Sequence, residues 1–307
     1  MSTPTPSPSM RAVLERLATE DRGLLDPTTL APQAGRHLAD LTNMRWNEDL
    51  PPVAQARTLM HADLPARLVV PENNAGREAI LHVHGGGWAF CSAATHEGAA
   101  RRLANATGAR VLTVEYRLAP EHPYPQGLED VLAAWAARDR SLTWSVAGDS
   151  AGANLALAAM VRLIEGGAAP QNLPRTALLF YGVYGADFTT PSYEQLAEGP
   201  GLTRAKMQRY WNWYAPQEAR EAADVAPLAA SDTTLTALPP LYLNAAELDP
   251  LRSDTELLAA RLSSLGRKDV FDLVPGVVHG FMQMGSALEE ARAAFKRAGT
   301  VFKQGTA

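Results

Sequence analysis

The chain has 307 residues, 46% of them hydrophobic and 20% charged, so it can bury the core of one large α/β domain with an attachment, or of two small domains. Its formal net charge of −5, without a run of Lys and Arg, argues against nucleic acid as a partner. The single cysteine, Cys91, excludes an intramolecular disulfide, and its role stays open. The first residues lack a signal-peptide pattern and no apolar run approaches about 20 residues, so we expect a cytoplasmic protein without a membrane span.

The predicted elements change character along the chain. The first ten residues are rich in Pro, Ser and Thr and are predicted to be disordered, whereas residues 11–50 carry apolar side chains at helical spacing. Beyond Pro52, short β-type runs alternate with helical stretches. The predicted strands are Ala66–Val70, Ala79–His84, Arg110–Tyr116, Thr143–Ala147, Thr176–Tyr181, Leu241–Ala245 and Val270–Val274. The predicted helices are Thr95–Thr107, Gly127–Arg138, Ala151–Glu165, Ser253–Leu265 and Ser286–Val301. This alternation predicts an α/β fold with a mostly parallel sheet and helices on both faces.

One long segment interrupts the alternation. About sixty residues between the runs that end at Tyr181 and begin at Leu241 contain no clear strand, which is too long for a plain loop. An aromatic-rich helix from Thr203 to Tyr214, with Thr203 as its N-cap, fits there, and we interpret the segment as a helical cap over the carboxyl edge of the sheet. The predicted division is 1–52 as N-terminal tail and cap helices, 53–185 and 223–307 as the α/β domain, and 186–222 as the cap insertion.

The pentapeptide GDSAG at residues 148–152 lies between a predicted strand and a predicted helix. This setting is typical of a nucleophile elbow, in which Ser150 stands exposed on a strained turn. Gly148 and Gly152 allow the close backbone approach that such a turn needs. The N-terminus of the following helix directs its dipole and free N–H groups towards a developing anion. An ordinary Gly/Ser turn that caps a helix is the alternative interpretation.

A second motif, HGGGW at residues 84–88, follows another predicted strand. Three consecutive glycines are costly in conformational entropy, so a backbone that must approach another group closely explains them. We predict that the N–H groups of Gly85, Gly86 and Ala151 receive the oxyanion formed when Ser150 attacks an ester carbonyl. An ordinary flexible turn is the alternative, whereas a phosphate-binding loop would need a different spacing that is absent here.

The same motif contains part of an H-x-H pair, His82 and His84, which could bind a metal in a hydrolase of another type. Two ligands make no zinc site, and no further carboxylate or cysteine has suggestive spacing, so no metal is predicted. His84 is instead expected to brace the glycine loop by hydrogen bonding.

A serine at neutral pH needs an adjacent base, and His279 is the candidate among seven histidines. It follows the last predicted strand, where an α/β-hydrolase carries its base. The acid is expected after the preceding strand, in the chain order Ser, Asp, His. Asp249 is best placed, with Glu247 and Asp254 as alternatives. Asp249 could also cap a helix that has Pro250 at its first position.

Together these motifs resemble the bacterial hormone-sensitive-lipase-like esterases, called family IV. The resemblance covers about residues 65–300 and rests on HGGGW at 84–88, YRLAPEHPYP at 116–125, GDSAG at 148–152, and DPL at 249–251 with HGF at 279–281. It implies an α/β-hydrolase fold with an eight-stranded sheet and a helical cap, the oxyanion donors given above, and no cofactor. Ala153, where the family usually has glycine, and Ser253-Asp254, in place of Asp-Glu, depart from the pattern.

The resemblance also implies a serine carboxylesterase that acts on short- to medium-chain acyl esters through an acyl-enzyme on Ser150. A deacetylase, an amidase or a formamidase with the same triad is the alternative. A non-catalytic relative such as the plant gibberellin receptors is disfavoured because those lack the catalytic histidine, which is present here as His279. A dehydratase like some plant relatives is a further alternative.

Four aromatic residues are candidates for contacting an apolar substrate: Trp88, Tyr184, Trp211 and Tyr214. The expected partner is a small-molecule ester. A homodimer is compatible with the family, whose members are often dimers, but no interface stands out in the sequence.

Overall fold

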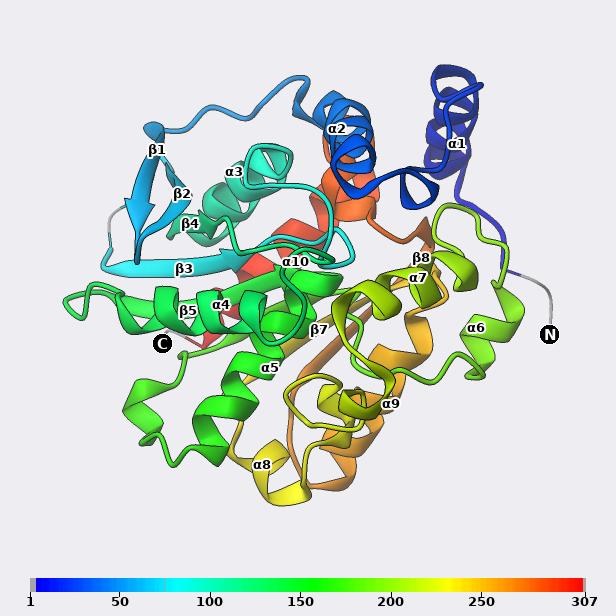
Figure 1. Cartoon of the computed structure of the whole chain (residues 1–307). Coiled ribbons are helices and arrows are strands. Elements are labelled where there is room, and N and C mark those ends of the chain that lie inside the picture. Colours follow the sequence, from blue (N-terminus) through cyan, green and yellow to red (C-terminus); the bar gives the residue numbers. More distant parts are fainter. Residues whose placement is uncertain (1–3, 75, 306–307) are drawn as a thin grey trace.

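The chain is built around one eight-stranded sheet, seen in a computed structural model that describes residues 4–74 and 76–305 (Figure 1). The strand order is β1-β2-β4-β3-β5-β6-β7-β8. β1 pairs antiparallel with β2 and β2 antiparallel with β4, and all other neighbours are parallel. The strands are β1 (Gln55–His61), β2 (Leu64–Val70), β3 (Glu78–Val83), β4 (Arg110–Val114), β5 (Thr143–Asp149), β6 (Ala177–Phe180), β7 (Leu241–Leu248) and β8 (Val270–Val278). The predicted α/β fold is confirmed. β1 was not predicted, because this edge strand is largely exposed on both faces and therefore lacks an apolar alternation.

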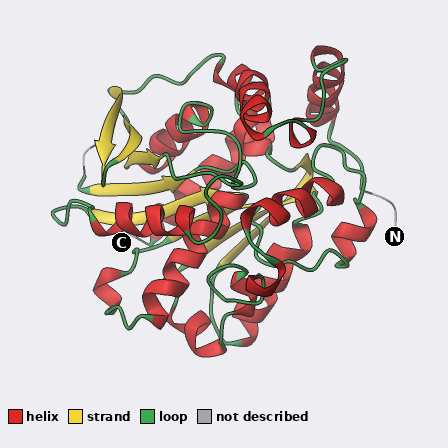
Figure 2. Cartoon of the chain, viewed as in Figure 1, coloured by secondary structure: helices red, strands yellow, loops and turns green. Residues whose placement is uncertain are grey.

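Helices cover both faces of the sheet (Figure 2). They are α1 (Pro8–Glu20), α2 (Pro32–Asn43), α3 (Glu97–Thr107), α4 (Gln126–Ala136), α5 (Ala151–Glu165), α6 (Pro191–Gln195), α7 (Arg204–Tyr214), α8 (Asp232–Ala237), α9 (Arg252–Ser264) and α10 (Glu289–Gln304). α3 and α10 pack on one face, and α4, α5 and α9 on the other. Successive strand residues point to opposite faces, so Val146 of β5 joins one core and Ala147 joins the other.

The helix that follows β5 is surrounded on every side. All residues of α5 from Ala151 to Val161 are buried, and most of them are alanine or another apolar residue. A helix that is apolar all round is stable only when it is covered all round. Here β5, α4 and α8 provide that cover. The turn between β5 and α5 is therefore anchored at both ends in the core.

The N-terminal segment joins the end of the molecule where α6 and α7 lie (Figure 1). α1 begins at Pro8, with the Ser7 hydroxyl accepting from the Met10 amide at 3.2 Å, and the Ser7 amide donates to the Gly276 carbonyl at 2.9 Å. The prediction that the first ten residues are disordered is therefore wrong for residues 8–10, because capping and a contact with β8 hold them. Residues 1–3 lie outside the described part of the chain.

The helix predicted within the cap segment is confirmed as α7, with the Thr203 side chain accepting from the Lys206 amide at 3.2 Å. Polar contacts tie α7 to the N-terminal segment. Arg209 donates to the Thr28 hydroxyl at 2.9 Å, and Asp26 lies 3.6 Å from Arg209 and 3.8 Å from Lys206. Segments far apart in the sequence thus combine over one end of the sheet.

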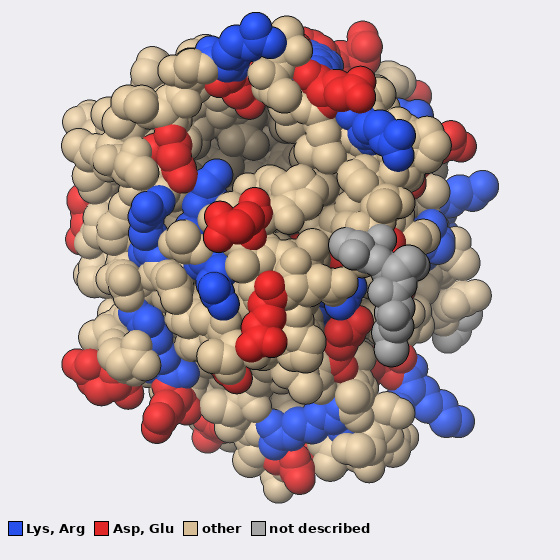
Figure 3. Space-filling model, turned by 90° about the vertical axis from the view of Figure 1, so that its right-hand side faces the viewer, with Lys and Arg blue, Asp and Glu red and all other residues tan. Residues whose placement is uncertain are grey.

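Two surface properties bear on partners. On the face seen in Figure 3, Lys and Arg side chains are interspersed with Asp and Glu and form no basic patch, and the upper part of that face is hollowed. Among the helices of residues 4–74 and 76–305, none is both long enough and apolar enough to cross a bilayer.

Candidate active site

The turn at Ser150 is strained and sterically crowded. Ser150 has φ 53° and ψ −120°, a conformation that L-residues rarely adopt. A Cβ on Gly148 would lie 2.5 Å from the backbone of Gly152, and a Cβ on Gly152 would lie 2.0 Å from the Val83 carbonyl oxygen. Only glycine fits at these two positions, which explains the GDSAG pattern. The predicted elbow is confirmed in its geometry.

Three side chains distant in sequence meet at this turn. The Ser150 hydroxyl lies 2.9 Å from Nε2 of His279, and Nδ1 of His279 lies 2.7 Å from Oδ2 of Asp249. A carboxylate can only accept, so His279 donates from Nδ1, and its Nε2 is free to accept the serine proton. Asp249 is fully buried, and the His279 ring packs edge-on against Tyr181 with centroids 4.9 Å apart. The structure therefore brings Ser150, His279 and Asp249 into one hydrogen-bonded series.

The two alternative acids point elsewhere. Glu247 accepts from the Gly276 amide at 2.7 Å, and Asp254 accepts from the amides of Tyr184 and Gly185 at 2.7 and 2.8 Å. Complete burial raises the pKa of Asp254 to about 7. Neither side chain contacts the imidazole.

Asp249 does not serve as a helix N-cap. Its Oδ1 accepts from the Leu251 amide at 2.8 Å, but α9 begins only at Arg252. The second oxygen of the carboxylate is directed at His279.

The prediction that Gly85 donates to the oxyanion is wrong. Its amide donates to Oδ1 of Asp149 at 3.0 Å, and a Cβ on Gly85 would lie 2.5 Å from that carboxylate. Among the described residues, the amides of Gly86, Gly87 and Ala151 have no hydrogen-bond acceptor. Gly86 and Gly87 have φ of 118° and 59°, which turns this part of the loop in a way that side chains disfavour.

Asp149, next to the nucleophile, holds the glycine loop at residues 85–87 in place through a hydrogen bond to its first amide. Besides the Gly85 amide, its carboxylate lies 3.3 Å from Nε2 of His96 and accepts from the Tyr181 hydroxyl at 3.4 Å. Burial works to raise the pKa of Asp149, but the imidazoles, His96 first, hold that pKa at about 2. Asp149 therefore stays ionised as an acceptor. GDSAG contains this residue, yet the motif alone indicates no partner for it.

His84 braces the loop as predicted. Its Nδ1 donates to the Gly85 carbonyl at 2.8 Å, and its ring stacks on Tyr116 with centroids 4.5 Å apart. The Tyr116 hydroxyl in turn donates to the His84 carbonyl at 2.9 Å, so the YRLAPEHPYP block supports the glycine loop. Within residues 4–74 and 76–305, no group of three His, Cys, Asp or Glu could hold a metal ion.

The aromatic residues predicted to contact substrate are part of the core instead. The side chains of Trp88, Tyr184, Trp211 and Tyr214 are at most 2% exposed. Trp88 stacks on Tyr214 with centroids 4.2 Å apart and planes within 4°, and its indole donates to Asn154 at 3.2 Å. The rings of Trp88, Trp211 and Tyr214 attach α7 to the α/β domain, and Tyr184 belongs to the same core, so the prediction of substrate contact is corrected.

A small cavity of about 140 Å³ opens above Ser150. Tyr210 and Met207 of α7 face into it, together with Leu202 from the loop before that helix. The full lining is Asn43, Gly86, Gly87, Cys91, His96, Asp149, Ser150, Tyr181, Leu202, Met207, Tyr210, His279, Gly280 and Gln283. Burial raises the pKa of the Cys91 thiol to about 12, so this residue is an unreactive part of the wall.

A serine on a strained strand–helix turn, joined through an imidazole to a buried carboxylate, defines a serine hydrolase of the α/β type. Residues 80–283 match the family described as alpha/beta hydrolase fold. The chain is 34% identical over 249 residues to Carboxylesterase NlhH of Mycobacterium tuberculosis, and this alignment covers 76% of each protein. The chain therefore belongs to the α/β-hydrolase family, and its resemblance to hormone-sensitive-lipase-like esterases is confirmed.

Solved structures agree with this assignment. A thermostable esterase from Pseudomonas putida superposes with a TM-score of 0.87 at 29% identity, covering 99% of this chain and 98% of the other. An α/β-hydrolase enzyme from the metagenome of Lake Arreo, Spain, has a TM-score of 0.89 at 28% identity, with 98% of both chains covered. Nearly the whole chain is covered in both superpositions.

Proposed function

We propose that the chain hydrolyses carboxylic esters by a two-step acyl transfer, with Ser150 as nucleophile, His279 as base and Asp249 as the group that orients the base. The activity class is that of its relatives: the chain is a carboxylic ester hydrolase of the serine type. The observation that supports the residue roles is the hydrogen-bonded series from Asp249 through His279 to Ser150, with distances of 2.7 and 2.9 Å.

The reaction proceeds through an ester of the serine. As Ser150 Oγ bonds to the carbonyl carbon, its proton passes to Nε2 of His279, and the imidazolium is stabilised by Asp249. Collapse of the tetrahedral intermediate breaks the bond to the alcohol, which leaves with the proton from Nε2. Water then gives a proton to the same nitrogen and attacks the carbonyl carbon of the acyl-enzyme. Collapse of this second intermediate breaks the bond to Ser150 Oγ, which takes the proton back from Nε2, and the acid is released.

The oxyanion of both tetrahedral intermediates would be held by the amides of Gly86, Gly87 and Ala151. All three lack an acceptor within the described chain, whereas the Gly85 amide is occupied by Asp149. Ala151 is also the first residue of α5, where the positive end of the helix dipole favours an anion. Each such donor contributes about 3–4 kcal/mol to transition-state stabilisation.

The cavity above Ser150 supports an acyl group at the short end of the short- to medium-chain range. Its volume of about 140 Å³ is below the roughly 300–1,000 Å³ of pockets for drug-sized ligands. The wall formed by Leu202, Met207 and Tyr210 is apolar apart from the phenol group. We expect kcat/KM for p-nitrophenyl esters to be highest for acetate or butyrate and to fall for octanoate. A maximum at octanoate would contradict this preference.

The deciding test is the variant Ser150→Ala. It should lose turnover of p-nitrophenyl acetate, and intact-protein mass spectrometry should detect the acyl-enzyme only when Ser150 is present. Ser141→Ala, at an exposed serine, is the matched control and should behave as wild type. Activity retained by Ser150→Ala would refute the proposed role. Parallel assays with p-nitroacetanilide distinguish an esterase from an amidase, because only an amidase cleaves it efficiently.

The assembly and organisation of the protein are further proposals. β8 is an edge strand with Val270, Phe271 and Leu273 each about 40% exposed, which supports a homodimer through this edge. Size-exclusion chromatography with light scattering should give a dimer for wild type and a monomer for Phe271→Asp.

The single cysteine supports a cytoplasmic location. The cavity lining from α2 and α7 supports residues 1–52 and 186–222 as the cap.

A further inference from the structure

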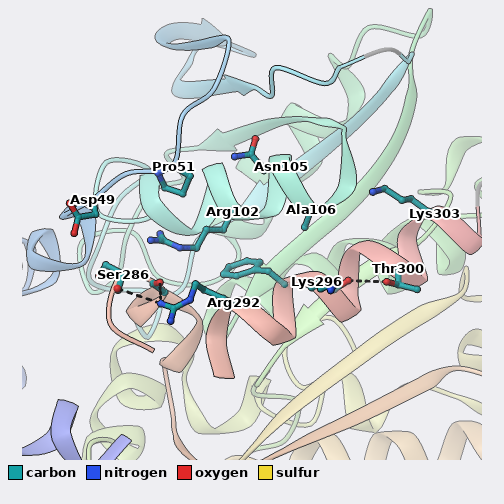
Figure 4. A pocket seen from close by; sticks show the side chains of 12 residues that line it. Asp49, Pro51, Arg102, Asn105, Ala106, Ser286, Arg292, Lys296, Thr300 and Lys303 are labelled. Carbon is teal, nitrogen blue, oxygen red and sulfur yellow. Dashed lines mark hydrogen bonds between the residues drawn. The ribbon is translucent and has the colours of Figure 1, made fainter. Parts of the chain in front are cut away.

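A second cavity lies between α3 and α10, apart from the catalytic one (Figure 4). Its volume is about 600 Å³, compared with about 140 Å³ above Ser150, and the two cavities share no lining residue. The lining consists of Asp49, Pro51, Arg102, Asn105, Ala106, Gly285, Ser286, Arg292, Phe295, Lys296, Thr300 and Lys303. A volume of this size is typical of small-molecule sites, and the mechanism above makes no use of it.

Two arginines from different helices border the same end of this cavity. Arg102 comes from α3 and Arg292 from α10 (Figure 4). Arg102 donates to the Gly98 carbonyl at 3.0 Å, and Arg292 donates to the Gly285 carbonyl at 3.0 Å. Within residues 4–74 and 76–305, neither guanidinium forms an ion pair with a carboxylate, and the nearby Asp49 forms none either.

The positive charge at this end of the cavity is only partly balanced, because Asp49 and Glu290 act on Arg102 and Arg292 at longer range, without an ion pair among the described residues. Arg102 is half-buried, and burial, followed by the charge of Arg292, lowers its pKa. A guanidinium nevertheless stays charged in proteins. Lys296 adds positive charge along the wall, where Asp49 is the lining carboxylate. An anion bound between the two arginines would relieve their repulsion and accept their remaining N–H groups.

The rest of the cavity surface is mostly apolar, although Asn105, Ser286 and Thr300 also line it. The apolar lining consists of Phe295, Ala106 and Pro51, and Phe295 is only 4% exposed. The carbon stem of Lys296 extends this apolar surface. A ligand that fills the space must combine one anionic end with an uncharged, apolar remainder. Bare phosphate would satisfy the arginines but would leave the apolar surface uncovered.

We propose that the cavity between α3 and α10 is a second binding site, for a small carboxylate that carries an apolar chain or ring. The carboxylate lies between Arg102 and Arg292, whose planar groups match its two oxygens. The apolar part lies over Phe295 and Ala106.

Isothermal titration of the folded protein with hexanoate tests this site. Hexanoate should bind with one-to-one stoichiometry, and inorganic phosphate and hexanol, which each provide only half of the chemistry, should bind at least about tenfold more weakly. Arg102→Gln and Arg292→Gln should each weaken hexanoate binding about tenfold or more. Arg57→Gln, at an exposed arginine on β1, is the matched control and should leave the affinity unchanged.

Several results would overturn the proposal. Absence of hexanoate binding to wild type would refute the site, and binding that both cavity variants leave unchanged would place the ligand elsewhere. Phosphate binding as tight as hexanoate binding would refute the ligand class. Arg102 is half-buried, so its variant could lose stability, and the exposed Arg292 then decides. p-Nitrophenyl acetate turnover should persist in both variants, so failure of this site is separable from failure of the proposed esterase mechanism.

Discussion

Removal of the Asp149 carboxylate is expected to slow catalysis, while the protein still folds and its catalytic triad still assembles. The carboxylate accepts from the Gly85 amide at 3.0 Å and so holds the loop that presents Gly86 and Gly87. A hydrogen bond to a charged group contributes about 1.5–3 kcal/mol, and about 1.4 kcal/mol corresponds to a factor of ten in rate. If Asp149→Ala loses that energy only in the transition state, kcat falls about 10- to 150-fold while KM changes little.

Asp149→Asn is the matched control, because the amide oxygen can still accept from Gly85. We expect it to lose less activity than Asp149→Ala in steady-state assays with p-nitrophenyl acetate. Circular dichroism and thermal unfolding establish that both variants are folded, since Asp149 also contacts His96 and Tyr181. Two outcomes would refute the reasoning: a folded Ala variant with kcat within about twofold of wild type, or an Asn variant as slow as the Ala variant.

Three further predictions concern Asp249, Asp254 and Gly152. Asp249→Asn should lower kcat by about 10⁴-fold because the His279 tautomer is no longer specified, and a loss below tenfold would contradict the role given to Asp249. Burial raises the pKa of Asp254 from 3.8 to about 7, so the stability linked to its protonation is complete below pH 3.8 and is lost as the pH rises through 7. Urea unfolding should therefore show Asp254→Asn gaining up to about 4 kcal/mol over wild type at pH 8 and little at pH 4; an equal difference at both pH values would exclude this titration. Gly152→Ala places a Cβ 2.0 Å from the Val83 carbonyl and should lower the free energy of unfolding by more than about 2 kcal/mol, and an unchanged melting temperature would show that the turn can relax.

The parts of the site that depend on local backbone conformation could be predicted from the sequence. Ser150 needs a positive φ and close neighbours, and this demand leaves glycines at fixed offsets that can be recognised without coordinates. His279 and Asp249 were predicted because each follows a strand, and the carboxyl ends of parallel strands share one edge of the sheet. The helix α7 could be predicted because its Thr203 N-cap and its length are local properties.

The face that α7 turns towards the catalytic cavity was not predictable in the same way. Its sequence places aromatic residues around the helix, and one step along the chain rotates a side chain by about 100°. Tyr210 therefore faces the cavity, whereas Trp211 is buried against Trp88. Only the docking of α7 on the α/β domain decides between them.

By itself, the sequence determined the fold class, the nucleophile turn and the candidate triad. These follow from hydrophobic periodicity, from the glycines of a strained turn and from the order of strands along the chain, all of which can be read from short stretches of sequence. The tertiary structure alone decided which glycine amides are free and which carboxylate meets the imidazole. It also decided that two arginines on α3 and α10, which form no ion pair within the described part of the chain, border one cavity. The physical reason is that hydrogen-bond pairing and burial depend on distances between segments far apart in the chain, and composition and spacing carry no measure of those distances.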